Sequence, residues 1–169
     1  MKPDILKKIK NRWLVSLSIS LGLTISLIDP ALSGQRPNIK TTPVVINNDV
    51  GGQLIHRQKE IHEYWKTGRE VRILGDICYS ACTMYLGLDR DKVCVRRNTE
   101  FGFHGPSILG LFPAKGEQRE LGVTIMAGYY PEPIKAWYIR EASKKTYGYH
   151  YLKGDYLLKL GYRECSEQK

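Results

Sequence analysis

The stretch Gly75-Asp76-Ile77-Cys78-Tyr79-Ser80-Ala81-Cys82 decides the fold. It follows a short alternating run, Glu70 to Leu74, that predicts a strand, and it leads into an apolar run that predicts a helix over about Ala81 to Leu88. A strand, a glycine-containing turn and a helix in this order are typical of α/β folds. The turn also carries a serine, whose hydroxyl a sharp bend can present to a ligand.

The same order occurs once before this stretch. Thr42 to Asn47 contains Pro43-Val44-Val45-Ile46, which predicts a short buried strand, and Asn47 to Gly52 has the composition of a turn. A helix is expected from about Gln53 to Thr67, ended by Gly68, because its apolar residues recur near one face of a helical period. These residues are Leu54, Ile55, Ile61, Tyr64 and Trp65.

The chain after the central stretch predicts two more strands, Lys92 to Val95 and Thr99 to Phe103, the second of which ends at His104. We expect a long loop over 105–120, a helix over 131–143, and a last helix over 151–160 that ends at Gly161. The whole pattern predicts one small α/β domain, residues 42–169, with mostly parallel strands and crossover helices.

The N-terminal residues differ in composition from this domain. A basic stretch comes first, and Trp13 to Ile28 then runs for 16 residues without a charge, short of the roughly 20 residues that a membrane span needs. Asp29-Pro30 breaks the run, and small residues follow at Ala31 and Ser33. This order predicts a secretory signal peptide over 1–33, a linker over 34–41, and a periplasmic or secreted protein. The alternative is a retained membrane anchor.

Removal of residues 1–33 would change the charge balance only modestly. The chain has 26 Lys and Arg and 17 Asp and Glu, and this segment holds five of the former and two of the latter, which leaves 21 against 15. The basic residues are scattered, without a basic stripe interleaved with aromatic residues. We therefore expect a solvated surface rather than a nucleic-acid partner, and no motif indicates a nucleotide or another cofactor.

The four cysteines, Cys78, Cys82, Cys94 and Cys165, all follow the predicted signal peptide. An even number in an exported chain predicts two disulfides, and three pairings are open. A zinc site is the disfavoured alternative, because no second paired Cys or His motif follows Cys78 and Cys82. A Cys78–Cys82 disulfide would rigidify the serine turn. We instead favour pairing of either cysteine with Cys94 or Cys165, which would brace the small domain.

Three features indicate chemistry when they are taken together. Gly51-Gly52 lies between a predicted strand and a helix, where backbone N–H groups lack intrahelical partners and can bind an anion. Ser80 fits a nucleophile with the Ala81 N–H beside it, although Ser80 alone fits a helix N-cap better. His104, at the end of a strand, fits a general base for Ser80, although alone it fits a structural histidine.

These features lie in three segments: Val45-Ile46-Asn47 with Gly51-Gly52; Cys78 to Cys82; and Lys92 to Val95 running on to Phe103-His104-Gly105-Pro106. Together the segments resemble the Clp protease proteolytic subunit, in the wider crotonase-like superfamily, and most closely its uncharacterised exported members with a Cys-x-Ser-Ala-Cys core. The resemblance spans residues 42–106 and extends to 151–161. It implies a fold of repeated β-β-α units.

The resemblance also implies the roles of the residues. Ser80 would be the nucleophile, His104 its general base, and the N–H groups of Gly51 or Gly52 and of Ala81 would form the oxyanion hole. The substrate would be a peptide or protein. The region around Tyr129, Tyr130, Trp137 and Tyr138 matches one that builds oligomer contacts in the family, so a homo-oligomer is one outcome, although we favour a core role for these aromatic residues. We expect no ATPase partner outside the cytoplasm.

The sequence departs from the family at two places. The loop Asn48-Asp49-Val50 is one residue longer, and no carboxylate stands where the family has its triad aspartate, a position near Tyr149. Asp155 falls inside the predicted last helix, so the third triad member is unassigned. Of the other histidines, we expect His56 and His62 on the surface and His150 in an aromatic cluster. The sequence thus predicts an exported serine hydrolase, a peptidase with a Ser–His pair, and the alternative is an inactive binding or assembly module on the same fold.

Overall fold

A computed structural model of the protein describes residues 42–166. The predicted signal peptide, residues 1–33, and the predicted linker, residues 34–41, lie outside this range. Among the described residues, no helix combines the length and the apolar character that crossing a membrane requires.

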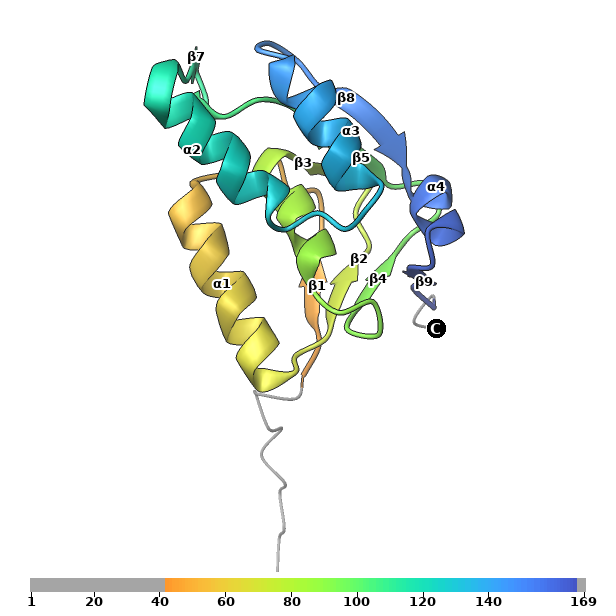
Figure 1. Cartoon of the computed structure of the whole chain (residues 1–169). Coiled ribbons are helices and arrows are strands. Elements are labelled where there is room, and N and C mark those ends of the chain that lie inside the picture. Colours follow the sequence, from red (N-terminus) through yellow and green to blue (C-terminus); the bar gives the residue numbers. More distant parts are fainter. Residues whose placement is uncertain (1–41, 167–169) are drawn as a thin grey trace, which may run out of the picture. The chain divides into compact units, whose positions relative to one another are not determined.

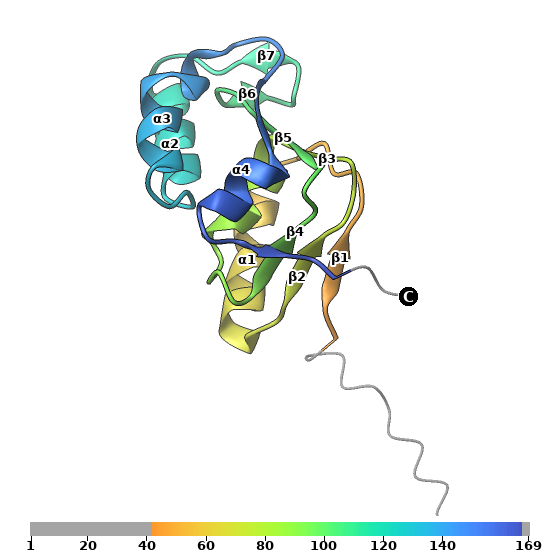
Figure 2. The ribbon, with the colours of Figure 1, turned by 90° about the vertical axis from the view of Figure 1, so that its right-hand side faces the viewer.

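One sheet of the domain has four parallel strands in the order β1-β2-β4-β9. They are β1 (Val44–Ile46), β2 (Val71–Ile73), β4 (Val93–Val95) and β9 (Arg163–Glu164). The two central strands, β2 and β4, are rich in β-branched residues whose side chains are buried in the core: Val71, Ile73, Val93 and Val95. The predicted mixed α/β fold with parallel strands is therefore confirmed, and Figures 1 and 2 show the sheet with α1 packed beside it.

A second sheet has three strands in the order β3-β5-β8. They are β3 (Ile77–Tyr79), β5 (Glu100–Phe103) and β8 (His150–Lys153). β3 runs parallel to β5, whereas β8 is antiparallel to β5. Consecutive strands thus alternate between sheets, because β2 and β4 belong to the first sheet and β3 and β5 to the second. This alternation brings the ends of β3 and β5 side by side.

The helices lie around these sheets as Figure 1 shows. They are α1 (Leu54–Thr67), the 3₁₀ helix η1 (Ser80–Gly87), α2 (Gly116–Ala127), α3 (Ile134–Arg140), the short 3₁₀ helix η2 (Ala142–Lys144) and α4 (Gly154–Lys159). α1 contacts both η1 and α2, and α2 contacts α3. The expected stop of α1 is found, because Gly68 adopts the left-handed conformation (φ 63°) at its C-terminus.

Several expected elements differ from the structure. The long loop expected over 105–120 contains a small hairpin, β6 (Ser107–Ile108) with β7 (Phe112–Pro113), and the start of α2. Glycine and proline concealed this helix, whose few buried residues cluster toward its C-terminal end. The helix expected over 151–160 is also wrong in its first half, because residues 150–153 pair with β5 as β8, and only α4 is helical.

The aromatic residues of the C-terminal half belong to the core. Tyr130 and Tyr138 are buried, and their rings lie 4.9 Å apart in an edge-to-face arrangement. Trp137 is half-buried and packs against Phe103 of β5. The preference for a core role is therefore confirmed for Tyr130 and Tyr138. Tyr130 also packs against Phe103, so these rings hold the segment around α3 against β5.

Candidate active site

Ser80 occupies a strained turn between β3 and η1. Its φ of 53° lies in the left-handed region, which non-glycine residues rarely adopt. The residue in the N-cap position of η1 is Tyr79, and no side chain caps this helix. The N-cap role that Ser80 alone would favour is therefore wrong. A nucleophilic serine on a strained strand-to-helix bend is the arrangement of known hydrolase elbows, and strain of this kind concentrates at functional sites.

His104 lies within hydrogen-bond distance of this serine. Its Nε2 atom is 2.7 Å from the Ser80 Oγ atom. The strand register explains the proximity, because Tyr79 of β3 is opposite Gly102 of β5, so the residues just beyond both strand ends meet. The backbone of His104 is held by the Tyr138 hydroxyl, which donates to its carbonyl oxygen at 3.2 Å. The structure thus brings together the two residues that the sequence singled out 24 positions apart.

The protonation of His104 suits a general base. Burial lowers the pKa of its imidazole from the usual value of 6.5, because desolvation disfavours the charged form. The ring is therefore neutral at pH 7. In the tautomer with the proton on Nδ1, Nε2 accepts a hydrogen bond from the Ser80 hydroxyl, which is the geometry that proton abstraction requires.

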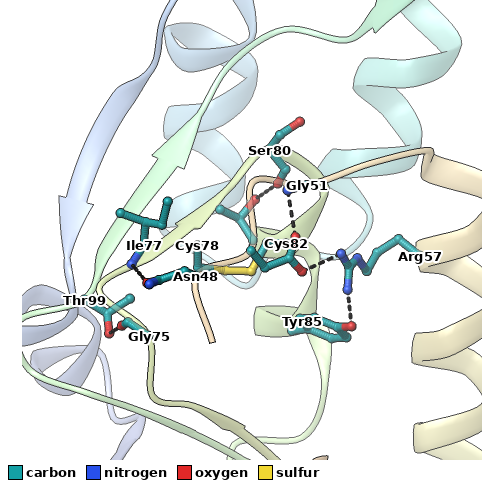
Figure 3. Close-up of a disulfide and its surroundings, with 12 residues drawn as sticks. Asn48, Gly51, Arg57, Gly75, Ile77, Cys78, Ser80, Cys82, Tyr85 and Thr99 are labelled. Carbon is teal, nitrogen blue, oxygen red and sulfur yellow. Dashed lines mark hydrogen bonds and ion pairs between the residues drawn. A yellow bond between two sulfur atoms is a disulfide. The ribbon is translucent and has the colours of Figure 1, made fainter. Parts of the chain in front are cut away.

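The glycine turn packs directly against the serine turn, as Figure 3 shows for Gly51 and Ser80. A Cβ atom added to Gly51 would lie 2.7 Å from the Ser80 Cβ atom and 3.1 Å from the Ala81 backbone nitrogen. The φ of Gly51 is 106°, so both the space and the backbone conformation require glycine here. The Gly51 N–H donates to the Asp49 carboxylate (2.7 Å). Gly52 and Ala81 are then the remaining candidate donors to an oxyanion.

The cysteines form two disulfides, Cys78–Cys82 and Cys94–Cys165. The favoured pairing of Cys78 or Cys82 with a distant cysteine is therefore wrong, and the alternative that closes the serine turn is correct (Figure 3). The reason is geometric, because Cys78 ends up on β3 and Cys82 in the first turn of η1, with Cα atoms 5.3 Å apart. No free cysteine remains among the four for a zinc ion to bind.

A pocket of about 540 Å³ opens at the Ser80–His104 pair. Its polar part comes from the glycine turn and the two candidate catalytic residues, and its apolar part includes Leu54, Pro106 and Met126. A concave, partly apolar cavity with a few convergent polar groups is typical of sites for small molecules and for segments of chains. The pocket thus joins Ser80, His104, Gly51 and Gly52, whereas the buried Ala81 does not line it.

An aromatic residue, Tyr149, stands near the position where the expected resemblance would place a triad aspartate. The Tyr149 ring packs edge-to-face on the His104 ring, with centroids 4.9 Å apart, and Tyr149 lines the pocket. No hydrogen bond joins His104 Nδ1 to any residue in the range 42–166. Asp155 lines a different pocket, with Arg97, Asn98 and Lys153, and does not line the pocket at His104.

The remaining histidines lie away from the pair. His56 and His62 are exposed on α1, as expected. His150 begins β8 and packs edge-on to Trp137, with ring centroids 6.1 Å apart, which confirms its place in an aromatic cluster. Within residues 42–166, no group of three or more His, Cys, Asp or Glu side chains is arranged to hold a metal ion.

The sequence did not single out two charged residues of the site. Asp49 lies in the turn before the glycine pair, and Arg57 lies one turn into α1, where its guanidinium is almost buried and binds the Asp49 carboxylate at 2.6 Å. An arginine on a helix and an aspartate in a turn are common on protein surfaces, so no pattern distinguished this pair. Only the fold, which lays α1 beside η1, shows that the two charges lie together, with Arg57 buried and Asp49 partly buried.

Comparisons with protein-family models, with curated proteins and with solved structures found no match to this chain. The assignment of function therefore rests on the geometry of the site.

Proposed function

We propose that the protein is an exported serine hydrolase of the crotonase-like fold that cleaves peptides. Ser80 Oγ attacks the substrate carbonyl carbon while His104 Nε2 takes the hydroxyl proton. The N–H groups of Gly52 and Ala81 bind the oxyanion that develops on the carbonyl oxygen. His104 then returns the proton to the leaving amine, and water, activated by the same imidazole, hydrolyses the acyl-enzyme. No cofactor is required.

The observation that carries this proposal is the Ser80–His104 pair. The hydroxyl is 2.7 Å from Nε2, it stands on a left-handed turn, and it faces a pocket. A helix-capping serine and a structural histidine would not need to share this arrangement. The lowered pKa of His104 keeps the imidazole neutral and able to accept the proton.

Two further features support the fold and the compartment. The strands β2-β3 and β4-β5 form two consecutive pairs, and each pair sends its first strand to one sheet and its second strand to the other, as repeated β-β-α units would. Two disulfides are compatible with an oxidising compartment outside the cytoplasm. Sequencing of the N-terminus of the exported protein tests the compartment and the cleavage site, for which we expect Gly34 as the first residue.

A catalytically silent binding module on the same fold is the second candidate. The observation that favours it is the lack of an orienting acid at His104 Nδ1 among the described residues. In serine proteases, an orienting group of the wrong kind lowers kcat by about four orders of magnitude. Here the Tyr149 ring restricts the imidazole by packing rather than by a hydrogen bond.

Labelling with a fluorophosphonate probe tests the proposal. The purified, disulfide-intact protein should be labelled, and both Ser80→Ala and His104→Ala should abolish the label. Ser107→Ala and His150→Ala are matched controls: Ser107 also lines the pocket, His150 lies one residue from Tyr149, and neither belongs to the pair. A folded wild type that takes no label, or a label that survives in Ser80→Ala, would contradict the enzyme and favour the binding module.

A further inference from the structure

The glycine turn is bound by a partly buried carboxylate, that of Asp49, which the proposed reaction does not use. Asp49 pairs with β3 through its backbone, because its N–H donates to the Ile77 carbonyl (3.2 Å) and its carbonyl accepts from the Tyr79 N–H (2.8 Å). Its side chain turns back toward the glycine pair, where Oδ1 accepts from the Gly51 N–H at 2.7 Å. The same residue thus joins the glycine turn to β3, the strand that ends just before Ser80.

The other carboxylate oxygen of Asp49 is bound by Arg57, at 2.6 Å from Nη2. The Arg57 side chain is 9% exposed and the Asp49 side chain 18% exposed. A carboxylate with this little solvent would be costly without a paired cation. The ion pair therefore fixes the Asp49 carboxylate, and with it the direction in which the Gly51 N–H is held.

Arg57 is itself held from the far side. Its Nη1 atom donates to the Tyr85 hydroxyl and to Glu60, and its guanidinium lies over the Tyr85 ring, 4.3 Å from the centroid. Tyr85 belongs to η1, the helix that begins at Ser80. Figure 3 shows Arg57 reaching from α1 between Tyr85 and the glycine turn. The network therefore spans both elements that supply the candidate oxyanion donors.

We infer that Asp49, locked by Arg57, is a positioning residue for the oxyanion hole. This inference rests on the proposed hydrolase activity. By engaging the Gly51 N–H, Asp49 fixes the Val50–Gly51 peptide, which adjoins the peptide that carries the Gly52 N–H, so that Gly52 supplies the amide of this turn left for the substrate oxyanion. Arg57 also neutralises a carboxylate that would otherwise oppose the negative charge developing in the pocket. The pair acts through Gly52 and does not touch the substrate.

The test compares the rate of fluorophosphonate labelling, split into the inactivation rate constant and the reversible affinity for the probe. Asp49→Ala should lower the rate constant about thirtyfold, since small misplacements at a reacting centre cost up to about a hundredfold. Its reversible affinity for the probe should stay within about twofold of wild type. Asp49→Asn keeps one acceptor oxygen but loses the charge, and should lower the rate constant by about five- to tenfold. A merely structural role would lower the melting temperature and leave the rate constant of the folded protein unchanged.

Glu63→Gln is the matched control, because Glu63 is exposed on the same helix as Arg57 and is not one of the residues that bind Arg57 or Asp49. It should label at the wild-type rate. If Asp49→Ala does not fold, folded Asp49→Asn decides, and a wild-type rate constant in that variant overturns the inference. Failure of the wild type to label removes the proposed hydrolase, and the inference with it, whereas equal labelling of wild type and folded Asp49→Ala removes the inference alone.

Discussion

The two disulfides of this domain differ in what they enclose. Cys94–Cys165 joins β4 to the chain just after β9, across a sequence separation of 71, whereas Cys78–Cys82 spans a separation of four with Ser80 at its centre. In the chain-entropy view, a longer loop constrains the unfolded chain more, so the two bonds contribute about 4 and about 2 kcal/mol respectively. The comparison indicates that one disulfide stabilises the fold and the other shapes the candidate site.

The largest effect is expected from removal of the long-range disulfide. The double variant Cys94→Ala/Cys165→Ala should lose about 4 kcal/mol of unfolding free energy, because the loop it releases is long. Urea unfolding followed by circular dichroism measures this loss. In the folded protein below the urea midpoint, fluorophosphonate labelling should match wild type, because neither cysteine contacts the pocket. Loss of label in that folded variant would erase the distinction between the two bonds.

Removal of the short disulfide, Cys78–Cys82, should cost less stability than removal of the long one but should slow labelling more. Cys78→Ala/Cys82→Ala should lose about 2 kcal/mol of unfolding free energy. Its labelling rate should fall about tenfold, because the left-handed turn at Ser80 then loses its covalent closure and keeps only hydrogen bonds such as that from the Thr83 hydroxyl to the Ser80 carbonyl. The long-range variant is the control for general destabilisation. A short-disulfide variant that labels as fast as wild type would show that the turn keeps its shape without the bond.

Three strands of the four-stranded sheet could be predicted from the sequence, whereas the pairing of the cysteines could not. The strands at Val44–Ile46, Val71–Ile73 and Val93–Val95 were predictable, because their apolar runs are bounded by turn residues. The first of them was wrongly expected to be buried, since it is an edge strand on which Val45 is exposed. The pairing of the cysteines was not predictable, since it depends on β9, a strand of two exposed residues with no apolar pattern. That strand alone carries Cys165 to Cys94, which leaves Cys78 and Cys82 for each other.

The candidate site was likewise predictable in part. The sequence was sufficient to select Ser80, His104 and the glycine pair, because they lie in recognisable turns or at the end of a predicted strand. The Asp49–Arg57 pair depends on the packing of α1 against η1, and the contact of Tyr149 with His104 depends on β8. Residues 151–153 were expected in a helix, because their apolar and polar residues fit both the helical and the strand period over so short a segment.

A smaller effect is expected from relief of the strain that the short disulfide encloses. Ser80→Gly should be more stable than Ser80→Ala by about 1 kcal/mol, because glycine adopts the left-handed conformation without a Cβ penalty. Both variants lack the hydroxyl, so the hydrogen bond to His104 cancels in the comparison. Thermal unfolding of the two variants side by side measures the difference. Equal stability would mean that the turn at Ser80 relaxes once the hydroxyl is removed.

The smallest expected effect concerns the pH dependence of the pair. Burial lowers the pKa of His104, so the folded protein holds its proton less tightly than the unfolded chain. His104 therefore leaves stability unaffected well above pH 6.5, and stability falls as the pH drops from about 6.5 through the lowered folded pKa. Labelling requires the neutral imidazole, so its rate should rise with pH and reach half its maximum below pH 6.5.

The pH at half-maximal labelling also distinguishes the roles of the two disulfides, because Ser80 and His104 are held by different contacts. The pKa of His104 is lowered by the residues that bury its imidazole, whereas the Cys78–Cys82 bond closes the turn that carries Ser80. The short-disulfide variant should therefore label more slowly at every pH but with the wild-type midpoint. A midpoint that returns to about 6.5 in this variant would show that opening the turn lets water reach the imidazole. The bond would then support the general base as well as the nucleophile.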